Sequence, residues 1–490
     1  MMNPLRLTWC VAIVIGLPAC AWLPPAPHLA SMRHEAPLAA TVAASQDAWP
    51  TANWWEQYGD DTLNNLMIQA LATAPSLATA EARFNNARES VRVTAAIDGL
   101  RVDARGDVER QRLSDNGLIP PKFLGFQWYN QADLGLQASY SFDWWHKRRA
   151  TITAAIDDAQ AARLERSAAA ISLGAAIADS YFGWQADQAQ LTIARDQQAL
   201  ATRRRDITQA RVAAELEAVD MVYISDAEIA NLRESIVSLQ YSAELRRVAL
   251  AALLGVSTDT LPVFTAKPLP LVRMQLPNEV RIDLLARRAD ISASRWQVDA
   301  AQQRLGAARA EFLPDISLNA LVGLSSIELS KLFNAGSAVP AITAAVHLPL
   351  FDSGRLRAQY GARAAQVNAA IANYNQTVVV AAREVATQTL KLQQIAAQLS
   401  ERAAQIKTTT QLVEVAQTRN QQGLTDARPR LAAAQALQQQ QAALTNLDAA
   451  AISAEINLIL ALGGGYQAAV TDAASATSTS GVGPTHDTQF

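Results

Sequence analysis

The sequence predicts a mixed α/β membrane protein, in which each chain contributes four β-strands of membrane length and several very long helices. Three observations predict this fold class. Four segments alternate apolar and polar residues with a period of two, which is typical of strands with two different faces. The stretches that follow these segments run for tens of residues without proline. Landmarks of the first half recur in order in the second half, which indicates an internal two-fold repeat.

Composition favours helix and argues against several functional classes. Half of the 490 residues are hydrophobic but only 6% are aromatic, because alanine supplies much of the apolar content. Alanine and glutamine both favour long helices. The net charge of -3 argues against nucleic-acid binding, which is typical of strongly basic proteins. The sequence has no phosphate-binding loop, no Gly-x-Ser-x-Gly and no His-Glu-x-x-His motif, so we expect no catalytic residues and no enzyme activity.

The cysteines and histidines predict neither a disulfide in the body of the protein nor a metal site. Cys10 and Cys20 both lie within the first twenty residues, and the five histidines are far apart in the sequence. We therefore expect no cofactor apart from covalent acyl chains on Cys20, for the following reason.

The amino terminus has the organisation of a lipoprotein signal peptide. Arg6 precedes a short apolar run, residues 7–17, and the stretch Leu17-Pro18-Ala19-Cys20 resembles a bacterial lipobox. We expect removal of residues 1–19 and acylation of Cys20, so that several acyl chains anchor the mature protein. The alternative is an ordinary signal peptide with an incidental cysteine. Residues 20–53 then form the acylated N-terminus and an extended linker rich in proline and alanine.

The body of the chain divides into two similar halves. Phe142-Asp143 in the first half corresponds to Phe351-Asp352 in the second, at an offset of about 209 residues, and basic residues follow both pairs. The first repeat spans residues 54–262 and the second spans residues 263–466, each in the order helix, strand, strand, long helices. Residues 467–490 are rich in Ser, Thr, Gly and Ala, so we expect a disordered C-terminal tail.

Each repeat contains two alternating segments. In the first segment the apolar residues from Leu100 to Val108 share one face, and the charged residues share the other: Arg101, Asp103, Arg105, Asp107 and Glu109. The other segments are Leu134–Phe142, Ile316–Leu324 and Ile342–Leu350. Each has about the 9–11 residues that cross a bilayer as a tilted strand, with one face toward lipid and the other toward a wet lumen. A soluble, half-buried sheet would show the same alternation.

Four strands cannot close a barrel, because about eight strands are the practical minimum. An open sheet would leave unpaired backbone groups in hydrocarbon. If these strands cross a membrane, several copies of the chain must therefore pool their strands into one barrel.

The long segments predict coiled-coil helices joined by tight turns. Between Ala150 and Leu254 there is no proline, and apolar residues recur at spacings of three and four. The clearest turn is the stretch 423–426, in which Gly423 suits a helix C-terminus and Thr425 or Asp426 suits the next N-cap. Its counterpart in the first repeat is residues 215–218.

Together these features resemble the outer membrane factor family of TolC-like efflux ducts, and within it the outer-membrane lipoproteins of the OprM/NodT type. The resemblance runs from about Trp54 to Tyr466, and its markers are the stretches Trp54–Leu63, Leu284–Ile291, Phe312–Pro314 and Pro349–Gly354. It implies a homotrimer whose twelve strands form a transmembrane β-barrel, continued by an α-helical coiled-coil tunnel in the periplasm. The tunnel end would contact a periplasmic adaptor (membrane fusion) protein and, through it, an inner-membrane efflux pump.

The chain departs from the family pattern at the helical tips. Glu215 stands where a glycine is usual, and Arg428–Leu431 stands where aspartate rings are frequent. We hypothesise that Arg428 or Arg430, next to Leu431, makes a basic pore constriction that favours anionic solutes. The alternative is that these arginines are solvated or pair with Glu217 or Asp220.

The residues at the turns are candidates for contact with the adaptor: Leu216, Gly423, Leu424 and Thr425. The alternative is that they only cap the helix hairpins, and both roles are compatible.

These expectations define one function and two alternatives. The expected protein is lipid-anchored in the outer membrane of a Gram-negative bacterium, contacts outer-membrane lipid and extends into the periplasm. As a passive channel it would conduct drugs or other small solutes from the pump to the exterior. The alternatives are a duct for type I protein secretion and a periplasmic coiled-coil adaptor lipoprotein. The sequence identifies neither the solute nor the pump class.

Overall fold

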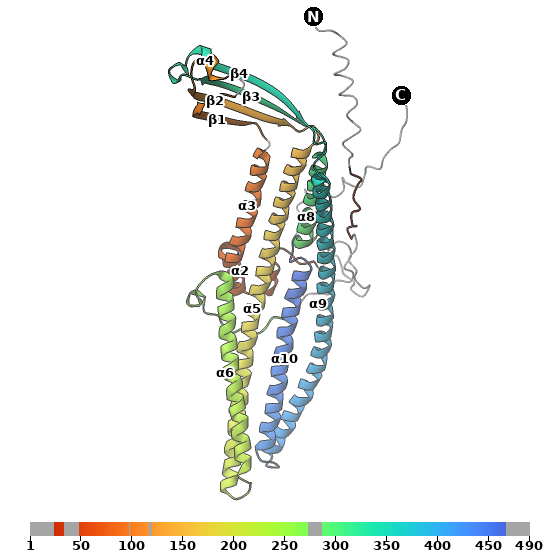
Figure 1. Cartoon of the computed structure of the whole chain (residues 1–490). Coiled ribbons are helices and arrows are strands. Elements are labelled where there is room, and N and C mark those ends of the chain that lie inside the picture. The colour runs from red at the N-terminus through yellow and green to blue at the C-terminus, as the bar shows by residue number, and fades with distance from the viewer. Residues whose placement is uncertain (1–23, 34–48, 98, 117–119, 273–286, 467–490) are drawn as a thin grey trace, which may run out of the picture. The chain divides into compact units, whose positions relative to one another are not determined.

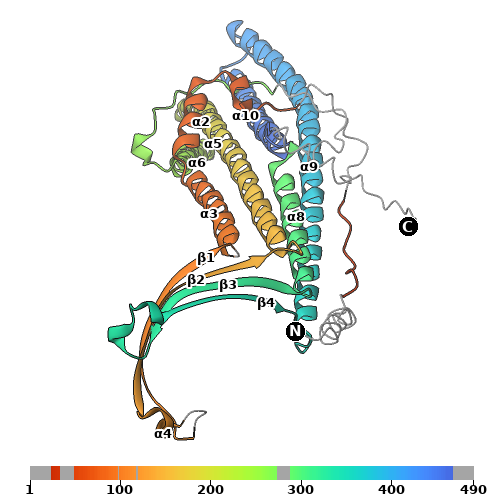
Figure 2. The ribbon, with the colours of Figure 1, turned by 90° about the horizontal axis from the view of Figure 1, so that it is seen from above.

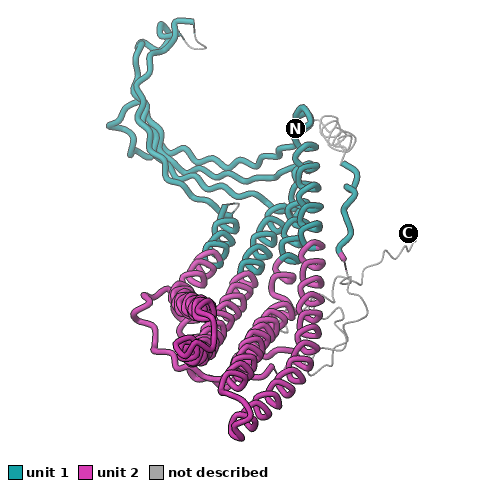
Figure 3. The backbone as a smooth tube through the Cα atoms, turned by 90° about the horizontal axis from the view of Figure 1, so that it is seen from below, with its two compact units in different colours: residues 1–32, 84–162, 294–374 teal, residues 33–83, 163–293, 375–490 magenta. Residues whose placement is uncertain are grey.

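The computed structural model describes residues 24–33, 49–97, 99–116, 120–272 and 287–466 (Figure 1). The chain forms two compact units, shown in Figure 3: unit 1 comprises residues 1–32, 84–162 and 294–374, and unit 2 comprises residues 33–83, 163–293 and 375–490. Each unit takes segments from both halves of the sequence, and in unit 1 strands from both halves form one sheet. The signal peptide, Cys20 and the C-terminal tail fall outside the described residues.

Unit 1 contains an antiparallel sheet in the order β1-β2-β3-β4, whose strands curve together as one layer (Figure 2). The strands are β1 (Arg101–Arg112), β2 (Trp128–Phe142), β3 (Asp315–Ser326) and β4 (Ala338–His347). The loop between β1 and β2 holds α4 (Pro121–Leu124), and the β3–β4 connection holds η5 (Leu329–Lys331) and η6 (Ala335–Ser337). In the described part of the chain, β1 and β4 each leave one edge without a partner strand.

The four predicted strands are confirmed, but the end of the fourth was wrong. β4 ends at His347, so Leu348 and Leu350 lie beyond it. Pro349 explains the difference, because it has no N–H to donate and restricts the backbone of the residue before it.

The strand register keeps apolar and polar residues on separate faces of the sheet. Ala138 is paired with Val102 on one side and with Ala320 on the other, whereas Gln137 is paired with Asp103. Large side chains of the apolar face are exposed, among them Val108 (76%), Val322 (68%) and Ile342 (79%). An apolar sheet face of this extent, uncovered by the chain itself, indicates contact with lipid or a partner.

The helices are as long as the sequence predicts. Both α5 (Lys147–Ala213) and α9 (Arg355–Gln421) have 67 residues, which corresponds to about 100 Å of helix. The remaining helical elements are η3 (Trp54–Tyr58), α2 (Asp61–Thr73), α3 (Pro75–Ile97), α6 (Asp220–Leu254), η4 (Thr258–Thr260), α8 (Ala289–Ala310) and α10 (Arg428–Ala461).

The marker stretch Trp54–Leu63 is joined by hydrogen bonds of Asp60 to neighbouring segments of unit 2. Asp60 caps α2 by accepting hydrogen bonds from the backbone of Thr62 (2.8 Å) and Leu63 (3.2 Å). It also accepts bonds from the Tyr181 hydroxyl (2.9 Å) and the Lys267 ammonium (3.1 Å), which join α2 to α5 and to the segment after α6. This connectivity explains why an acidic residue belongs at this point of the motif.

Helix α10 is long and apolar enough to span a membrane by length and composition, but its packing is that of a core helix. Ile452, Ile456 and Ile459 belong to the hydrophobic core of unit 2. Glu455 between them is fully buried and accepts a 2.8 Å hydrogen bond from the Tyr58 hydroxyl. Burial, followed by the charge of Glu455, raises the pKa of Tyr58 well above its ordinary value.

Candidate functional site: the helical tips

Two hairpin turns of unit 2 share one backbone geometry. After α5, Leu216 N–H donates to Arg211 (2.9 Å) and Glu215 N–H donates to Val212 (3.0 Å). The turn after α9 repeats this pattern: Leu424 N–H donates to the carbonyl of Arg419 (2.9 Å), and Gly423 N–H donates to the carbonyl of Asn420 (3.1 Å). Glu215 and Gly423 both have positive φ, 59° and 72°. These are Schellman turns, so the sequence correctly placed Glu215 at the position that glycine fills in the second hairpin.

The two residues proposed as the N-cap of α10 behave differently. Asp426 accepts a 3.0 Å hydrogen bond from the backbone N–H of Arg428, whereas the buried hydroxyl of Thr425 has no partner among the described residues. The N-cap position itself is Ala427, so the predicted N-cap was wrong, and Asp426, one residue earlier, satisfies one backbone N–H of the first turn.

Four charged side chains join the two hairpins at this end of unit 2. Glu217 accepts from Arg211 (3.0 Å) and from Arg428 (3.2 Å). Asp426 accepts from Arg428 (2.9 Å) and lies 3.9 Å from Arg211. We call Arg211, Glu217, Asp426 and Arg428 the tip cluster. Its two cations and two anions alternate, so each charge has two opposite neighbours.

The tip cluster answers one question that the sequence left open. Arg428 pairs with Glu217, one of the two partners considered, rather than with Asp220. The hydrogen bonds from the side chain and backbone of Arg428 lower the pKa of Asp426. Sequence reasoning missed Arg211, although its position matches that of Arg419 before the second turn.

The two other residues proposed for a constriction have different environments. Arg430 is half-buried, its Nε has no hydrogen-bond partner, and it makes no ion pair within the part of the chain that the structure describes. Leu431 is only 2% exposed and packs within its own protomer. Leu216 and Leu424, proposed for adaptor contact, are instead exposed at 64% and 69%.

Behind the tip cluster, a second set of polar contacts joins α5, α6 and α10. Gln435 is buried and hydrogen-bonds both Arg204 and Glu228. Arg204 also lies 3.5 Å from Glu228, and Arg205 bonds Asp226 at 3.0 Å. The hairpins of unit 2 are thus held together by charge at two levels.

Unit 1 contains a buried acidic residue that sequence reasoning missed. Asp157 of α5 is 5% exposed, and it occupies the same helix face as the buried residues Ala154, Ala161 and Leu164. Burial raises its pKa to about 6, and the charges of Asp299 and Asp158 add to the effect, while Arg304 opposes it. The sequence did contain a signal for this burial, because Asp157 is a charged residue within a stripe of apolar residues on α5.

Asp157→Asn is expected to stabilise the protein at pH 8 but not at pH 4. The pKa of Asp157 is raised on folding from 3.8 to about 6. The contribution of Asp157 to stability is therefore most favourable at low pH, falls as pH rises between these values, and stays reduced above them. The neutral amide removes a penalty on the order of 2 kcal/mol at pH 8. Melting temperatures of both proteins at the two pH values test this, and an equal shift at both would contradict it.

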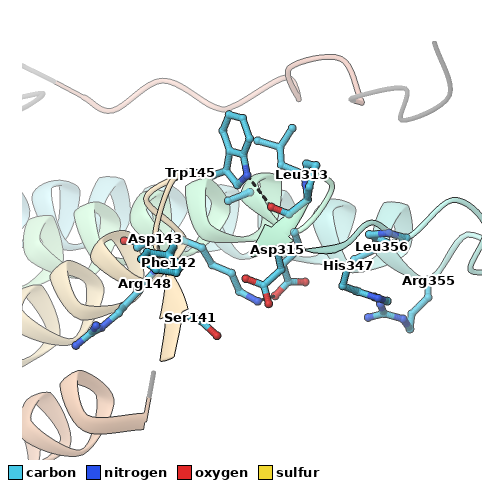
Figure 4. A pocket seen from close by; sticks show the side chains of 15 residues that line it. Ser141, Phe142, Asp143, Trp145, Arg148, Leu313, Asp315, His347, Arg355 and Leu356 are labelled. Atoms are coloured by element: carbon cyan, nitrogen blue, oxygen red, sulfur yellow. Dashed lines mark hydrogen bonds and ion pairs between the residues drawn. The ribbon is translucent and has the colours of Figure 1, made fainter. Parts of the chain in front are cut away.

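A cavity of about 340 Å³ lies where the strands of unit 1 meet the helices (Figure 4). Inside it, the Trp145 indole donates a 2.8 Å hydrogen bond to the carbonyl of Pro314, and Lys147 pairs with Glu311 at 3.2 Å. These contacts join the start of α5 to the α8–β3 connection, which gives the cavity walls a structural role. Among the described residues there is no cluster of His, Cys, Asp and Glu suited to a metal ion.

Comparison with known proteins identifies the family. The family described as "Outer membrane efflux protein" matches residues 66–256 and 281–464. The multidrug resistance outer membrane protein MdtQ of Escherichia coli O6:H1 is 32% identical over 472 residues, covering 94% of this chain and 98% of MdtQ. MdtP of E. coli K12 is 32% identical over 450 residues, covering 90% and 92%.

Solved structures agree with this assignment. The outer membrane protein VceC of Vibrio cholerae has a TM-score of 0.76 and 32% identity, covering 86% of this chain and 100% of VceC. The outer-membrane channel OprN has a TM-score of 0.81 at 24% identity, covering 92% and 100%, and so supports the fold. The predicted resemblance is confirmed: the chain belongs to the outer membrane efflux protein family and is an efflux channel of the outer membrane.

Proposed function

We propose that three copies of this chain form one twelve-stranded barrel, continued by a helical tunnel, which serves as the passive exit duct of a tripartite multidrug efflux system. The observation that carries the proposal is the open four-stranded sheet, apolar on one face and polar on the other. Its edges, β1 and β4, need partner strands in hydrocarbon, and neighbouring copies supply them. Three chains give twelve strands, above the minimum of about eight.

The helices support the same assembly. On α6, the exposed residues Val237, Tyr241, Leu245 and Val248 follow at spacings of four, four and three. On α9, Leu390, Leu412 and Val415 are exposed as well. Such stripes are packing faces of coiled coils, and neighbouring copies would cover them. The element order β-strand, β-strand, long helix, long helix occurs in both halves, which supports an internal repeat.

The position of residues 28–30 is compatible with an acyl anchor at Cys20. In unit 1, the backbone N–H of Ala30 donates to the Asn368 side chain (2.7 Å), and Asn368 donates to the carbonyl of His28 (3.3 Å). Asn368 lies thirteen residues after the start of α9, about 20 Å along the helix. Ten residues separate Cys20 from Ala30, a reach of up to about 33 Å. The acylated cysteine can therefore reach the level of the strands.

Mass spectrometry of the purified protein tests the lipid anchor. We expect a mature chain that begins at Cys20 and carries acyl chains, and we expect Cys20→Ser to remove the acyl mass. An unmodified N-terminus, or cleavage at another residue, would contradict the lipoprotein assignment while leaving the barrel intact.

The tip cluster is suited to hold the periplasmic end of the tunnel closed. It joins the α5–α6 hairpin to the α9–α10 hairpin through charges that are only partly exposed. The exposed Leu216 and Leu424, together with Gly423 and Thr425, would be contacted by the adaptor, whose binding separates the hairpins. Arg430, which has a charge but no ion partner in the described chain, would give the opened end a preference for anions.

Transport with and without the adaptor tests the function. In cells that lack other efflux channels, this protein with its adaptor and pump should restore export of a fluorescent dye. Deletion of the adaptor should abolish export while crosslinked trimers persist. Export that continued without the adaptor would contradict gated, passive conduction, and a monomer in both strains would contradict the shared barrel.

A further inference from the structure

The hairpin formed by β1 and β2 carries a basic and aromatic cluster that the duct function does not require. The pairing of β2 with β3 ends at Ala132, so Trp128–Gln131 and their partners on β1 extend beyond β3 (Figure 2). Arg110 and Arg112 lie on this extension. The loop beyond it includes α4, with Lys122 and Phe123. We call Arg110, Arg112, Lys122, Phe123 and Trp128 the rim cluster.

The arginines of the rim cluster continue the apolar face of the sheet. On β1, the even-numbered positions from Val102 to Val108 are uncharged, and the next two even positions are Arg110 and Arg112. Arg112 is the register partner of Trp128, and the Arg110 guanidinium carbon lies 5.6 Å from the centre of the Trp128 ring. Because alternate residues of a strand share a face, these three side chains extend the face assigned to lipid.

The rim cluster has an excess of positive charge. Arg112 lies 3.5 Å from Asp115, but Arg110 and Lys122 have no ion pair in the described part of the chain. Lys122 lies 5.1 Å from the ring centre of Phe123, which is 73% exposed. In the β3–β4 connection, by contrast, Lys331 is neutralised by Glu328 at 2.8 Å. Of these two connections, the surplus positive charge belongs to the β1–β2 hairpin.

The position of the rim cluster matches the headgroup level of a bilayer. The apolar face of β2 runs from Phe142 to Ala132, ten residue steps or about 33 Å of strand. At a tilt of about 40° this spans roughly 25 Å, the height of the apolar band of an outer-membrane barrel. The exposed Trp144 lies two residues past one end and the exposed Trp128 lies four residues past the other, in the manner of aromatic girdles. The rim cluster is at the end remote from the helices.

We propose that the rim cluster binds a phosphorylated, acylated glycolipid of the outer leaflet, with the chemistry of lipid A. Arg110, Arg112 and Lys122 would donate charge-assisted hydrogen bonds to its phosphates. Trp128 and Phe123 would pack against its sugar and acyl carbons. The proposal rests on the proposed function, because the strands must cross the membrane for the rim cluster to meet this leaflet.

The test compares lipid binding by the purified, full-length protein in detergent. Native mass spectrometry is performed with bisphosphorylated lipid A and with its dephosphorylated form. We expect the phosphorylated lipid to bind the wild-type protein, and the combined substitutions Arg110→Gln, Arg112→Gln and Lys122→Gln to weaken binding by about a hundredfold. The dephosphorylated lipid should bind both proteins equally weakly. Lys331→Gln, the matched control on the other loop, should bind like the wild type.

Three outcomes would overturn the proposal: no binding to the wild type, equal binding of the two lipid forms, or unchanged affinity of the triple variant. Should the triple variant fail to fold, Lys122→Gln alone, in the loop, must still weaken binding several-fold. The proposed function is checked separately by sedimentation of the protein with outer membranes. A protein that reaches the outer membrane and conducts, but ignores the phosphates, would refute this inference alone.

Discussion

Replacing Gly463 by alanine is expected to lower the free energy of unfolding of unit 2 by about 3 kcal/mol or more. Gly463 follows α10 with φ of +96°, and a Cβ added there would lie 2.0 Å from the backbone carbonyl oxygen of Arg287. Backbone cannot move aside as a flexible side chain can. The neighbouring Arg288 donates hydrogen bonds to Glu384 (2.9 Å) and to the carbonyl of Ala461 (2.9 Å). These bonds fix the position of the Arg287 backbone against Gly463. Chemical denaturation in detergent provides the measurement.

Two helical glycines serve as controls for Gly463→Ala. A Cβ added at Gly306 in α8 or at Gly361 in α9 would meet nothing within 4 Å, and neither residue has a positive φ. Alanine at these positions should be neutral or stabilise by up to about 1 kcal/mol. A Gly463→Ala protein as stable as these controls would show that the close approach to Arg287 is not required.

Removing Glu217 and Arg428 together is expected to raise the ion conductance of the isolated channel about tenfold, because the closed end loses its principal link between hairpins. Glu217 is bonded to both Arg211 and Arg428, so Glu217→Gln with Arg428→Ala leaves only the 3.9 Å approach of Arg211 to Asp426 within the tip cluster. Partly exposed ion pairs contribute up to about 1 kcal/mol each, and about 1.4 kcal/mol changes a population tenfold. Single-channel recording in planar bilayers measures the effect.

The same recordings separate gating from selectivity. Arg203→Ala removes an exposed α5 arginine for which the described chain provides no ion pair, and should leave conductance unchanged. Arg430→Ala should reduce preference for anions without opening the channel. Unchanged conductance of the double variant would refute closure by the tip cluster, and unchanged selectivity of Arg430→Ala would refute the basic constriction.

The strands could be predicted from sequence because period-two alternation directly reflects two environments. All four strands are found where alternation predicts them, but their bounds differ. Pro349 ends β4 earlier than the apolar pattern suggests, and β2 and β4 begin at Trp128 and Ala338, before the predicted Leu134 and Ile342. The long helices followed from the absence of proline. The division of the chain into units could not be predicted, because it depends on β2 pairing with β3 across the two halves of the chain.

The candidate site was predicted only in part. The offset between the halves placed Glu215 and Gly423 correctly at equivalent turns. Glu217 was considered as a partner of Arg428, yet 211 residues separate them, and only the folded hairpins show that Arg211 and Asp426 join them. The raised pKa of Asp157 was invisible in the sequence, because it arises from burial in the folded unit and from charges on α8.

Labelling of single cysteines along β4 tests most directly whether the strands form the wall of a membrane channel. The chain is suited to this, because its only cysteines are Cys10, in the predicted signal peptide, and Cys20. Cysteines that replace Thr343 and Ala345 should react with a water-soluble maleimide in intact outer membranes. Cysteines that replace Ile342, Ala344 and Val346 should not react with it, and a fluorophore attached to them by a membrane-permeant reagent should be quenched by a lipid-soluble quencher. Uniform reaction of all five positions with the water-soluble reagent would contradict a lipid-facing strand.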